Sequence, residues 1–119
     1  MNRLRIKVTC GAEAPERCNQ AFTVAATAIA AGADVGLWLT GEAAWFALPG
    51  KAEEFDLPLA TPLAELRDSV IAGGRLTVCT QCAERRGITT QDVLPDVWIA
   101  GSAAFTEEIL APDTQALVY

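Results

Sequence analysis

A chain of 119 residues has the length of one domain, residues 1–119, and is too short for two independent hydrophobic cores. Hydrophobic residues make up 51% of it and charged residues 20%, a composition that indicates a folded globular protein and excludes a disordered one. Fifteen acidic and nine basic residues give a net charge of -6, so we expect no direct nucleic-acid binding through a general electrostatic field.

The first part of the chain predicts a strand, a helix and a second strand. Residues 4–9 alternate and include β-branched side chains, so we expect a strand that ends at Cys10. Pro15 suits the first turn of a helix, and the apolar positions after it recur at helical spacing up to Gly32. Residues 34–39 form a short apolar run, which is typical of a strand buried on both faces.

Glycine and proline residues interrupt the segment 40–58, which predicts a long loop with a short helix at 43–48. Loops of this length in small domains are often functional or contact a partner. Trp45 and Phe46 are the large apolar residues of the loop. Because an apolar patch of this kind is usually covered, we expect another copy of the chain to cover it, which makes the protein a homo-oligomer.

Helix and strand alternate again after this loop. The Thr-Pro pair at 61–62 is typical of a helix start, and the two glycines at 73–74 end that helix. Residues 75–79 predict a third strand. We expect Thr80 to cap a short helix, which residues 86–88 close with a Schellman turn.

The remaining residues predict two further strands. Thr89 and Asp92, three positions apart, indicate one more helical turn. Residues 97–100 predict a fourth strand, a serine-capped helix follows over 103–110, and residues 115–119 predict the last strand. Strands that alternate with helices pair in parallel, so the fold class is α/β: a three-layer α/β/α domain with a five-stranded, mostly parallel, flavodoxin-like sheet.

The chain has no histidine, which excludes Ser-His and Cys-His catalytic pairs and zinc sites that need imidazole. Its first residues lack the apolar core of a signal peptide, and no run of about 18 apolar residues occurs. We therefore expect a soluble cytoplasmic protein without a membrane contact. In that compartment its four cysteines are free thiols, metal ligands or redox groups and not structural disulfides.

The sharpest motif is the Cys-x-x-Cys of Cys79 and Cys82, which spans a predicted strand end and helix start. A helix N-terminus carries partial positive charge and stabilises a thiolate, the nucleophile of disulfide exchange and sulfur transfer. We therefore predict Cys79 and Cys82 as the catalytic residues. The alternative is that both are buried as small hydrophobic side chains, as free cysteines often are.

Further candidates follow from the edge at which parallel sheets form their sites, outside the carboxyl ends of the strands. If the strand order is the common 2-1-3-4-5, the strands that end at Cys10 and Cys79 are neighbours. Cys10, Cys79 and Cys82 would then be weak candidate ligands for zinc, and we expect no other cofactor. The other candidates at this edge are Cys10, Gly11, Gly41, Glu42 and Thr80. Glu42 has an alternative role as a helix cap, and Arg85 with Arg86 forms a local basic spot.

The segment Leu76–Cys79 and the residues 80–88 after it resemble the part of DsrE/DsrF/TusD-like proteins in which an apolar strand ends in cysteine and a short helix closes at Arg-Gly-Ile. The resemblance implies one DsrE-like domain over 1–119 and a sulfur relay. Cys79 would accept sulfane sulfur as a persulfide and pass it to a partner protein, in an assembly of several subunits. Cys82 and Cys10 depart from the simplest, one-cysteine pattern.

Three functions stay open at this point. The first is a persulfide carrier that uses Cys79 and exchanges sulfur with donor and acceptor proteins. The second is a thiol-disulfide redox protein that uses Cys79 and Cys82. The third is a non-catalytic oligomeric binding or structural protein whose cysteines are buried or bind zinc.

Overall fold

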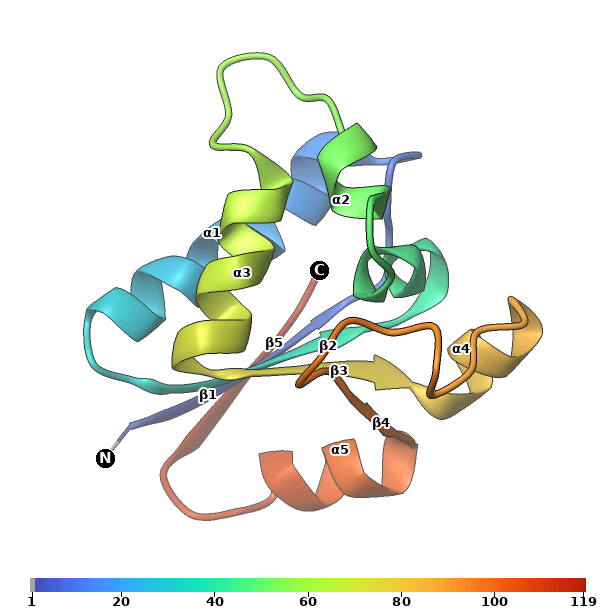
Figure 1. The fold of residues 1–119 in the computed structure, drawn as a ribbon. Helices are drawn as coiled ribbons and strands as arrows, with labels where there is room; N and C mark the ends of the chain where they lie inside the picture. Colours follow the sequence, from blue (N-terminus) through green and yellow to red (C-terminus); the bar gives the residue numbers. More distant parts are fainter. Residues whose placement is uncertain (1) are drawn as a thin grey trace.

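A parallel five-stranded sheet lies at the centre of the computed structural model, which describes residues 2–119 (Figure 1). Its strands are β1 (Arg3–Val8), β2 (Asp34–Leu39), β3 (Arg75–Cys79), β4 (Trp98–Ala100) and β5 (Thr114–Val118). They lie in the order β4-β3-β2-β1-β5, and every neighbouring pair is parallel. The predicted five-stranded sheet is thereby confirmed.

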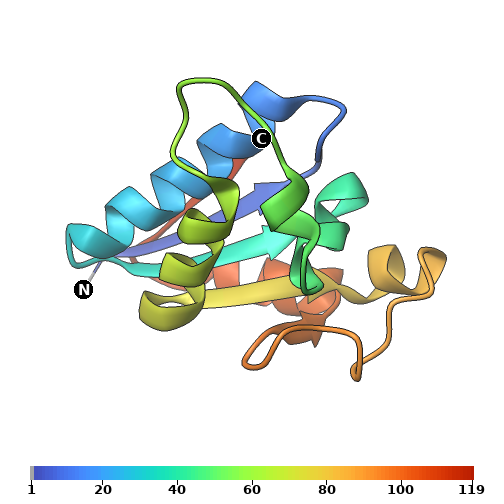
Figure 2. The same ribbon diagram turned by 45° about the horizontal axis from the view of Figure 1, so that its top comes forward.

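Helices cover both faces of the sheet and make the three predicted layers. They are α1 (Pro15–Ala30), the 3-10 helix η1 (Gly41–Ala47), α2 (Lys51–Glu54), α3 (Leu63–Gly73), α4 (Thr80–Arg85) and α5 (Ser102–Ile109). Figures 1 and 2 show α1 and α3 side by side on one face and α5 alone on the other. The short elements η1 and α4 lie beyond the carboxyl ends of β2 and β3 (Figure 2).

Strand alternation explains how the core forms. Side chains of a strand point to opposite faces in turn, so Ile6 and Val8 of β1 are fully buried toward α1 and α3, while Lys7 between them faces α5. Phe22 of α1, also fully buried, meets this face of the sheet. On the other face, Phe105 is the one buried residue of α5. The layer formed by α5 is therefore attached to the sheet more weakly than the layer of α1 and α3, because α5 buries a single large apolar side chain.

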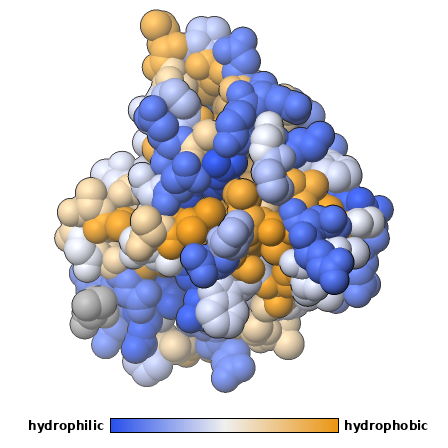
Figure 3. Space-filling view, viewed as in Figure 1, coloured by the Kyte–Doolittle hydropathy of each residue, from blue (hydrophilic) through white to orange (hydrophobic). Residues whose placement is uncertain are grey.

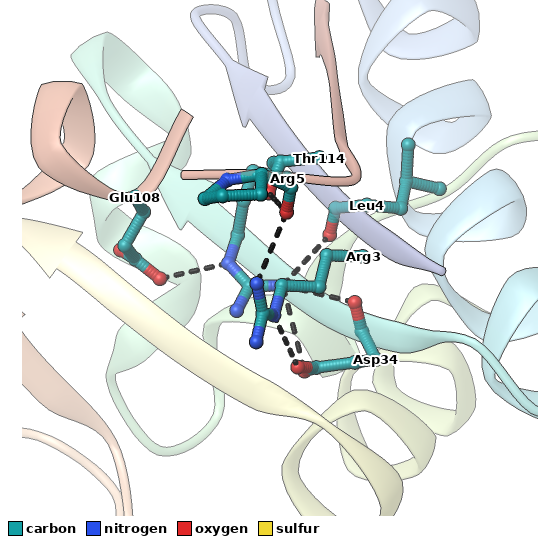
Figure 4. Close-up of polar contacts among 7 residues, drawn as sticks. Arg3, Leu4, Arg5, Asp34, Glu108 and Thr114 are labelled. Carbon is teal, nitrogen blue, oxygen red and sulfur yellow. Dashed lines mark hydrogen bonds and ion pairs between the residues drawn. The ribbon is translucent and has the colours of Figure 1, made fainter. Parts of the chain in front are cut away.

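A polar network joins α5 to the sheet near the amino ends of the strands (Figure 4). Nε of Arg5 donates a hydrogen bond to Oε1 of Glu108 at 2.7 Å, and its Nη1 donates to the backbone carbonyl of Asp34 at 2.9 Å. Arg3 adds an ion pair to Asp34 at 3.7 Å. Gly36 makes room for this arrangement, because a Cβ there would lie 2.8 Å from Cδ of Arg5.

The sheet does not have the common strand order 2-1-3-4-5, which was the condition for placing Cys10 beside Cys79. β2 lies between β1 and β3, with Ile6 beside Leu37 and Leu37 beside Leu76. β2, β3 and β4 are added one after another on the same side of β1. β5 then pairs with the opposite side of β1. Cys10 and Cys79 therefore follow strands that are not neighbours.

The prediction of an exposed aromatic loop is also wrong. Phe46 is 5% exposed, because its ring packs edge-on against Phe22 at 6.2 Å and against Phe55 at 5.7 Å. Trp45 is half-buried. The exposed large apolar side chains are Leu59, Trp98, Leu110, Leu117 and Val118. The loop between α2 and α3, which carries Leu59, forms the apolar tip at the top of Figure 3.

Two local predictions differ from the structure in detail. Pro62, and not Thr61, occupies the cap position of α3. Thr89 and Asp92 do make the predicted side-chain contact, with N and Oγ1 of Thr89 donating to Oδ2 of Asp92 at 2.8 and 2.9 Å. This contact closes a turn and not a helix, because Pro95 follows within three residues. Within residues 2–119, no helix is long and apolar enough to cross a membrane.

Candidate functional site

A cavity of about 470 Å³ opens at the carboxyl ends of β1, β2 and β3 and contains the Cys-x-x-Cys motif. Eight side chains line it: Lys7, Thr9, Thr40, Cys79, Gln81, Cys82, Arg85 and Ser102. Two are cations, two are thiols, four are neutral and polar, and none is a carboxylate. This is the edge at which parallel sheets of α/β proteins place their ligand sites.

Cys79 is the last residue of β3 and occupies the cap position of α4. Cys79 is 7% exposed, and its thiol is reached from the cavity. Sγ donates a hydrogen bond to Oε1 of Gln81 at 3.4 Å, within the criteria for a weak sulfur donor. The predicted position at the junction of strand and helix is correct, with Thr80 as the first residue of α4 and not as its cap.

Cys82 lies one turn into α4 and faces the loop after β2. The backbone N–H of Gly41 donates a hydrogen bond to its Sγ at 3.2 Å, which holds the sulfur against the loop after β2. Gly41 has φ +54, in the left-handed region that favours glycine. The two predicted residues are thus in direct contact, and a backbone shape available to glycine aims the N–H at the sulfur.

An ion pair between Glu42 and Arg86 fixes α4 against η1. Nε and Nη2 of Arg86 donate to Oε2 of Glu42 at 3.0 and 2.8 Å, and Nη1 donates to the carbonyl oxygen of Cys82 at 3.1 Å. These hydrogen bonds hold the pKa of Glu42 below its usual value. Glu42 therefore contacts the helix that carries Cys82, and not the cavity.

Cys10 and Gly11 lie apart from the Cys-x-x-Cys motif. Sγ of Cys10 faces the carbonyl oxygen of Ala14 at 3.9 Å, at the start of α1. Burial raises the pKa of Cys10, with the nearby Arg17 opposing the shift. Gly11 is packed so tightly that a Cβ would lie 2.8 Å from the backbone oxygen of Glu42. The predicted grouping of Cys10 with the other two thiols fails because β2 separates their strands.

Cys18 belongs to the core, as its place on the apolar stripe of α1 predicts. It is fully buried, and burial raises the pKa of its thiol to about 12, with smaller contributions from Cys10 and Glu13. All four cysteines are free thiols. In the part of the chain that the structure describes, no three Cys, Asp or Glu side chains gather where they could hold a metal ion.

Five residues that line the cavity were not predicted as site residues from the sequence: Lys7, Thr9, Thr40, Gln81 and Ser102. Thr9 and Thr40 follow β1 and β2, so their place after strands was a usable signal. Their hydroxyls donate to backbone carbonyls of Tyr119 at 2.7 Å and Val8 at 2.8 Å. The place of Lys7 at the cavity could be predicted only from knowledge of which face of β1 meets α5.

A second hollow, of about 340 Å³, is lined by residues of η1 and α2 and is mainly acidic in its charged residues. Its charged lining residues are Glu13, Glu42, Lys51 and Glu54, and it contains no cysteine. The first cavity, in contrast, is lined by two cysteines and by no carboxylate.

Comparison with known proteins gives a family and a fold. The model of the DsrE/DsrF-like family matches residues 4–114. The ychN protein of E. coli superimposes with a TM-score of 0.83 at 18% identity, with 100% of both chains covered. MTH1491 of Methanobacterium thermoautotrophicum, a protein of unknown function, gives 0.71 at 10% identity, also over 100% of both chains. BT1422 of Bacteroides thetaiotaomicron gives 0.61 at 14%, over 99% of this chain and 95% of its own. No curated protein matches the chain.

Proposed function

Because this chain belongs to the DsrE/DsrF-like family, which is generally associated with sulfur relay, we propose that it carries sulfur as a persulfide on Cys79. The observation that supports the proposal is the position of this cysteine. It ends β3 at the carboxyl edge of the sheet, and its thiol lines the cavity there beside a second thiol, that of Cys82. A nucleophile at this edge is accessible to a ligand while the sheet holds its backbone in place.

The proposed transfer proceeds in two steps. The Cys79 thiol first loses its proton to solvent, and the thiolate attacks the sulfane sulfur of a donor. A new S–S bond forms on Cys79, the bond between that sulfur and the donor breaks, and the donor fragment keeps the electron pair. The thiolate of an acceptor protein then attacks the outer sulfur of the persulfide, and Cys79 leaves as a thiolate.

Cys82 gives the persulfide a second outcome. Its Sγ accepts a hydrogen bond from the N–H of Gly41 and lines the same cavity as the carrier cysteine. Attack by Cys82 on the inner sulfur would form a Cys79–Cys82 disulfide and release hydrosulfide, with the electrons balanced within the step. We propose that Cys82 is this resolving thiol and limits how long an undelivered persulfide survives.

The test is intact-mass analysis of the purified protein before and after treatment with inorganic polysulfide. We expect the mass to rise in steps of one sulfur atom and the gain to disappear in Cys79→Ser. In Cys82→Ser the gain should persist longer, because the resolving thiol is gone. Cys18→Ser is the matched control, since its fully buried thiol should not matter. Sulfur uptake by other thiols while Cys79 stays unmodified would refute the proposal.

The second candidate function is thiol-disulfide exchange, favoured by the two thiols on one cavity. It requires a reversible Cys79–Cys82 disulfide that forms without any sulfur donor. A redox titration followed by the mass of the linked peptide tests this function, and the absence of a reversible Cys79–Cys82 disulfide would exclude it. Stepwise sulfur gain on Cys79, measured as above, is the result that only the carrier predicts. Unreactive thiols together with zinc in the purified protein would instead favour a non-catalytic role.

We also propose that the protein works in the cytoplasm as a homo-oligomer, as the family resemblance implies. Cytoplasmic thiols stay reduced, which a persulfide carrier requires. Both edge strands carry exposed apolar side chains, with Trp98 of β4 at 55% and Val118 of β5 at 67% exposure. Sedimentation at equilibrium tests this: a single species at the mass of one chain would contradict it.

A further inference from the structure

Two cations of the cavity beside Cys79 have no carboxylate partner among residues 2–119. Lys7 lies on the α5 face of β1, with Nζ 4.2 Å from the centre of the Phe105 ring. Arg85 is exposed near the end of α4. Its neighbour Arg86 is fully engaged with Glu42, whereas no ion pair to Lys7 or Arg85 exists within the described chain. The positive charge of both side chains is therefore available to a ligand.

The positive character of the cavity is local. The chain carries a net charge of -6, yet no aspartate or glutamate is among the residues that line the cavity. Charges that line a cleft with low-dielectric walls attract ligands of the opposite sign far more strongly than the same charges on an open surface. The protein as a whole is acidic and repels anions. The cavity beside the Cys79 thiol carries two unpaired cations and therefore attracts them.

Neutral donors complete the site. The side-chain oxygen of Gln81 accepts the Cys79 thiol, which leaves the amide NH₂ without an acceptor in the described residues. The hydroxyl of Ser102 likewise has no partner there. Unpaired donors and cations in one cavity of about 470 Å³ suit an anion of modest size.

From this arrangement we infer that the cavity is an anion-binding site and that the sulfur donor of Cys79 is a small anionic molecule. The inference deepens the proposed function and rests on it for the identity of the donor. Cys79 and Cys82 are 7% and 8% exposed and both line the cavity, so a small molecule that enters it meets both thiols.

The chemistry explains why such a site needs cations. A thiolate and an anionic donor, such as inorganic polysulfide, repel each other as they approach. Lys7 and Arg85 offset this repulsion, because both positive charges lie on the cavity that the two reactants share. In the step itself Cys79 gains one sulfur, and the polysulfide, shortened by one sulfur, leaves with the electron pair of the broken S–S bond.

The test compares two alkylating reagents of nearly equal size, the anion iodoacetate and the neutral iodoacetamide, with Cys79 followed by peptide mass analysis. We expect the iodoacetate-to-iodoacetamide rate ratio to fall about tenfold in the double variant Lys7→Gln/Arg85→Gln, the lower end of what a charged cleft contributes to association. The ratio in the wild type should also fall as salt is added.

The control is the double variant Arg17→Gln/Lys51→Gln, which makes the same change in net charge at exposed positions outside the cavity. An unchanged ratio in Lys7→Gln/Arg85→Gln, or an equal fall in the control, would overturn the inference. The single variant Arg85→Gln, at an exposed position, serves if the double variant fails to fold, and it should lower the ratio in the same direction.

Alkylation does not depend on sulfur transfer, so the two proposals can fail separately. A changed ratio without any sulfur uptake would keep the anion site and refute the persulfide carrier. Sulfur uptake by Cys79 with an unchanged ratio would keep the carrier and refute the anion site. Sulfur uptake by Cys79 from inorganic polysulfide should also slow in the double variant.

Discussion

The α-carbon of Gly41 lies so close to Thr9 that a Cβ atom on it would be 2.5 Å from the Thr9 carbonyl oxygen. Gly41 also has a positive φ of +54 and donates its N–H to Cys82. Glycine is therefore required at this position for two independent reasons, the backbone conformation and the close approach of another backbone segment.

Gly41→Ala should lower the free energy of unfolding by about 2–5 kcal/mol, the sum of the left-handed backbone cost and the overpacking cost. Gly50→Ala is the matched control, because Gly50 also has a positive φ of +82 but nothing within 4 Å of its Cβ position. The control should lose only about 1–2 kcal/mol. Urea unfolding measures both, and equal losses would show that the contact with Thr9 is unimportant.

The thiol of Cys18 should stay protonated in the folded protein well above the pH at which an exposed cysteine ionises. Its folded pKa is raised to about 12, so its contribution to stability is complete below the unfolded pKa and is lost as the pH rises toward 12. We expect the stability of the wild type to fall over this range more steeply than that of Cys18→Ala. Alkylation of Cys18 at pH 8 without unfolding would contradict this.

Phe105 anchors α5, and its ring packs edge-on against Trp38 at 5.3 Å. Phe105→Ala should lower the free energy of unfolding by about 3–4 kcal/mol, the usual cost of removing a buried aromatic ring. Because Trp38 is 3% exposed, its fluorescence should shift to longer wavelength when α5 loosens. Leu110→Ala, at the exposed end of the same helix, should change neither quantity.

Arg67 is a buried cation at 4% exposure, and its Nη1 and Nη2 donate to the two carboxylate oxygens of Glu53 at 2.9 Å each. Glu53 is half-exposed, so we expect Arg67→Ala to cost about 1–2 kcal/mol, near the lower end for hydrogen bonds to charged groups. Arg17→Ala, at an exposed position on α1, should cost less than about 0.5 kcal/mol. A loss for Arg67→Ala as small as that of the control would contradict the prediction.

The pair also predicts a pH dependence. Hydrogen bonds from Arg67 hold the pKa of Glu53 below its ordinary value, so the stabilisation is present above the unfolded glutamate pKa of about 4.3 and is lost as pH falls through the folded one. Chemical unfolding between pH 6 and pH 3 measures this. Glu53→Gln should flatten the acid limb of the stability profile, and an unaltered limb would count against the role of this carboxylate.

The sequence predicted the elements well because their signals are local. Residues 34–39 and 75–79 were predicted with the bounds that β2 and β3 have, since each is a short apolar run between clear breakers. The Schellman turn after α4 is also present, with the N–H of Ile88 donating to the carbonyl of Ala83 at 2.9 Å and φ +68 at Gly87. Such features depend on a few consecutive residues.

The strand order and part of the site could not be predicted, since both depend on residues far apart in the chain. No local pattern shows that β2 separates β1 from β3, so the expected approach of Cys10 to Cys79 was wrong. The contact of Glu42 with Arg86 spans 44 positions, and the sequence pattern offered Glu42 only as a site candidate or a helix cap. Lys7 likewise became a site residue only when the sheet placed it beside Cys79.

The pairing of β1 with β5 brings Arg3 beside Thr114, at nearly opposite ends of the chain. Closing so long a loop costs conformational entropy that no nearby contact offsets, so this pairing belongs to the late stages of folding. β5 has no second strand partner and its side chains are mostly exposed. It is therefore the strand that should open first in the folded protein, with amide hydrogens that exchange well before those of β2 at the centre. Each such opening would briefly uncover the edge of β1, the strand that carries Lys7 to the cavity of Cys79.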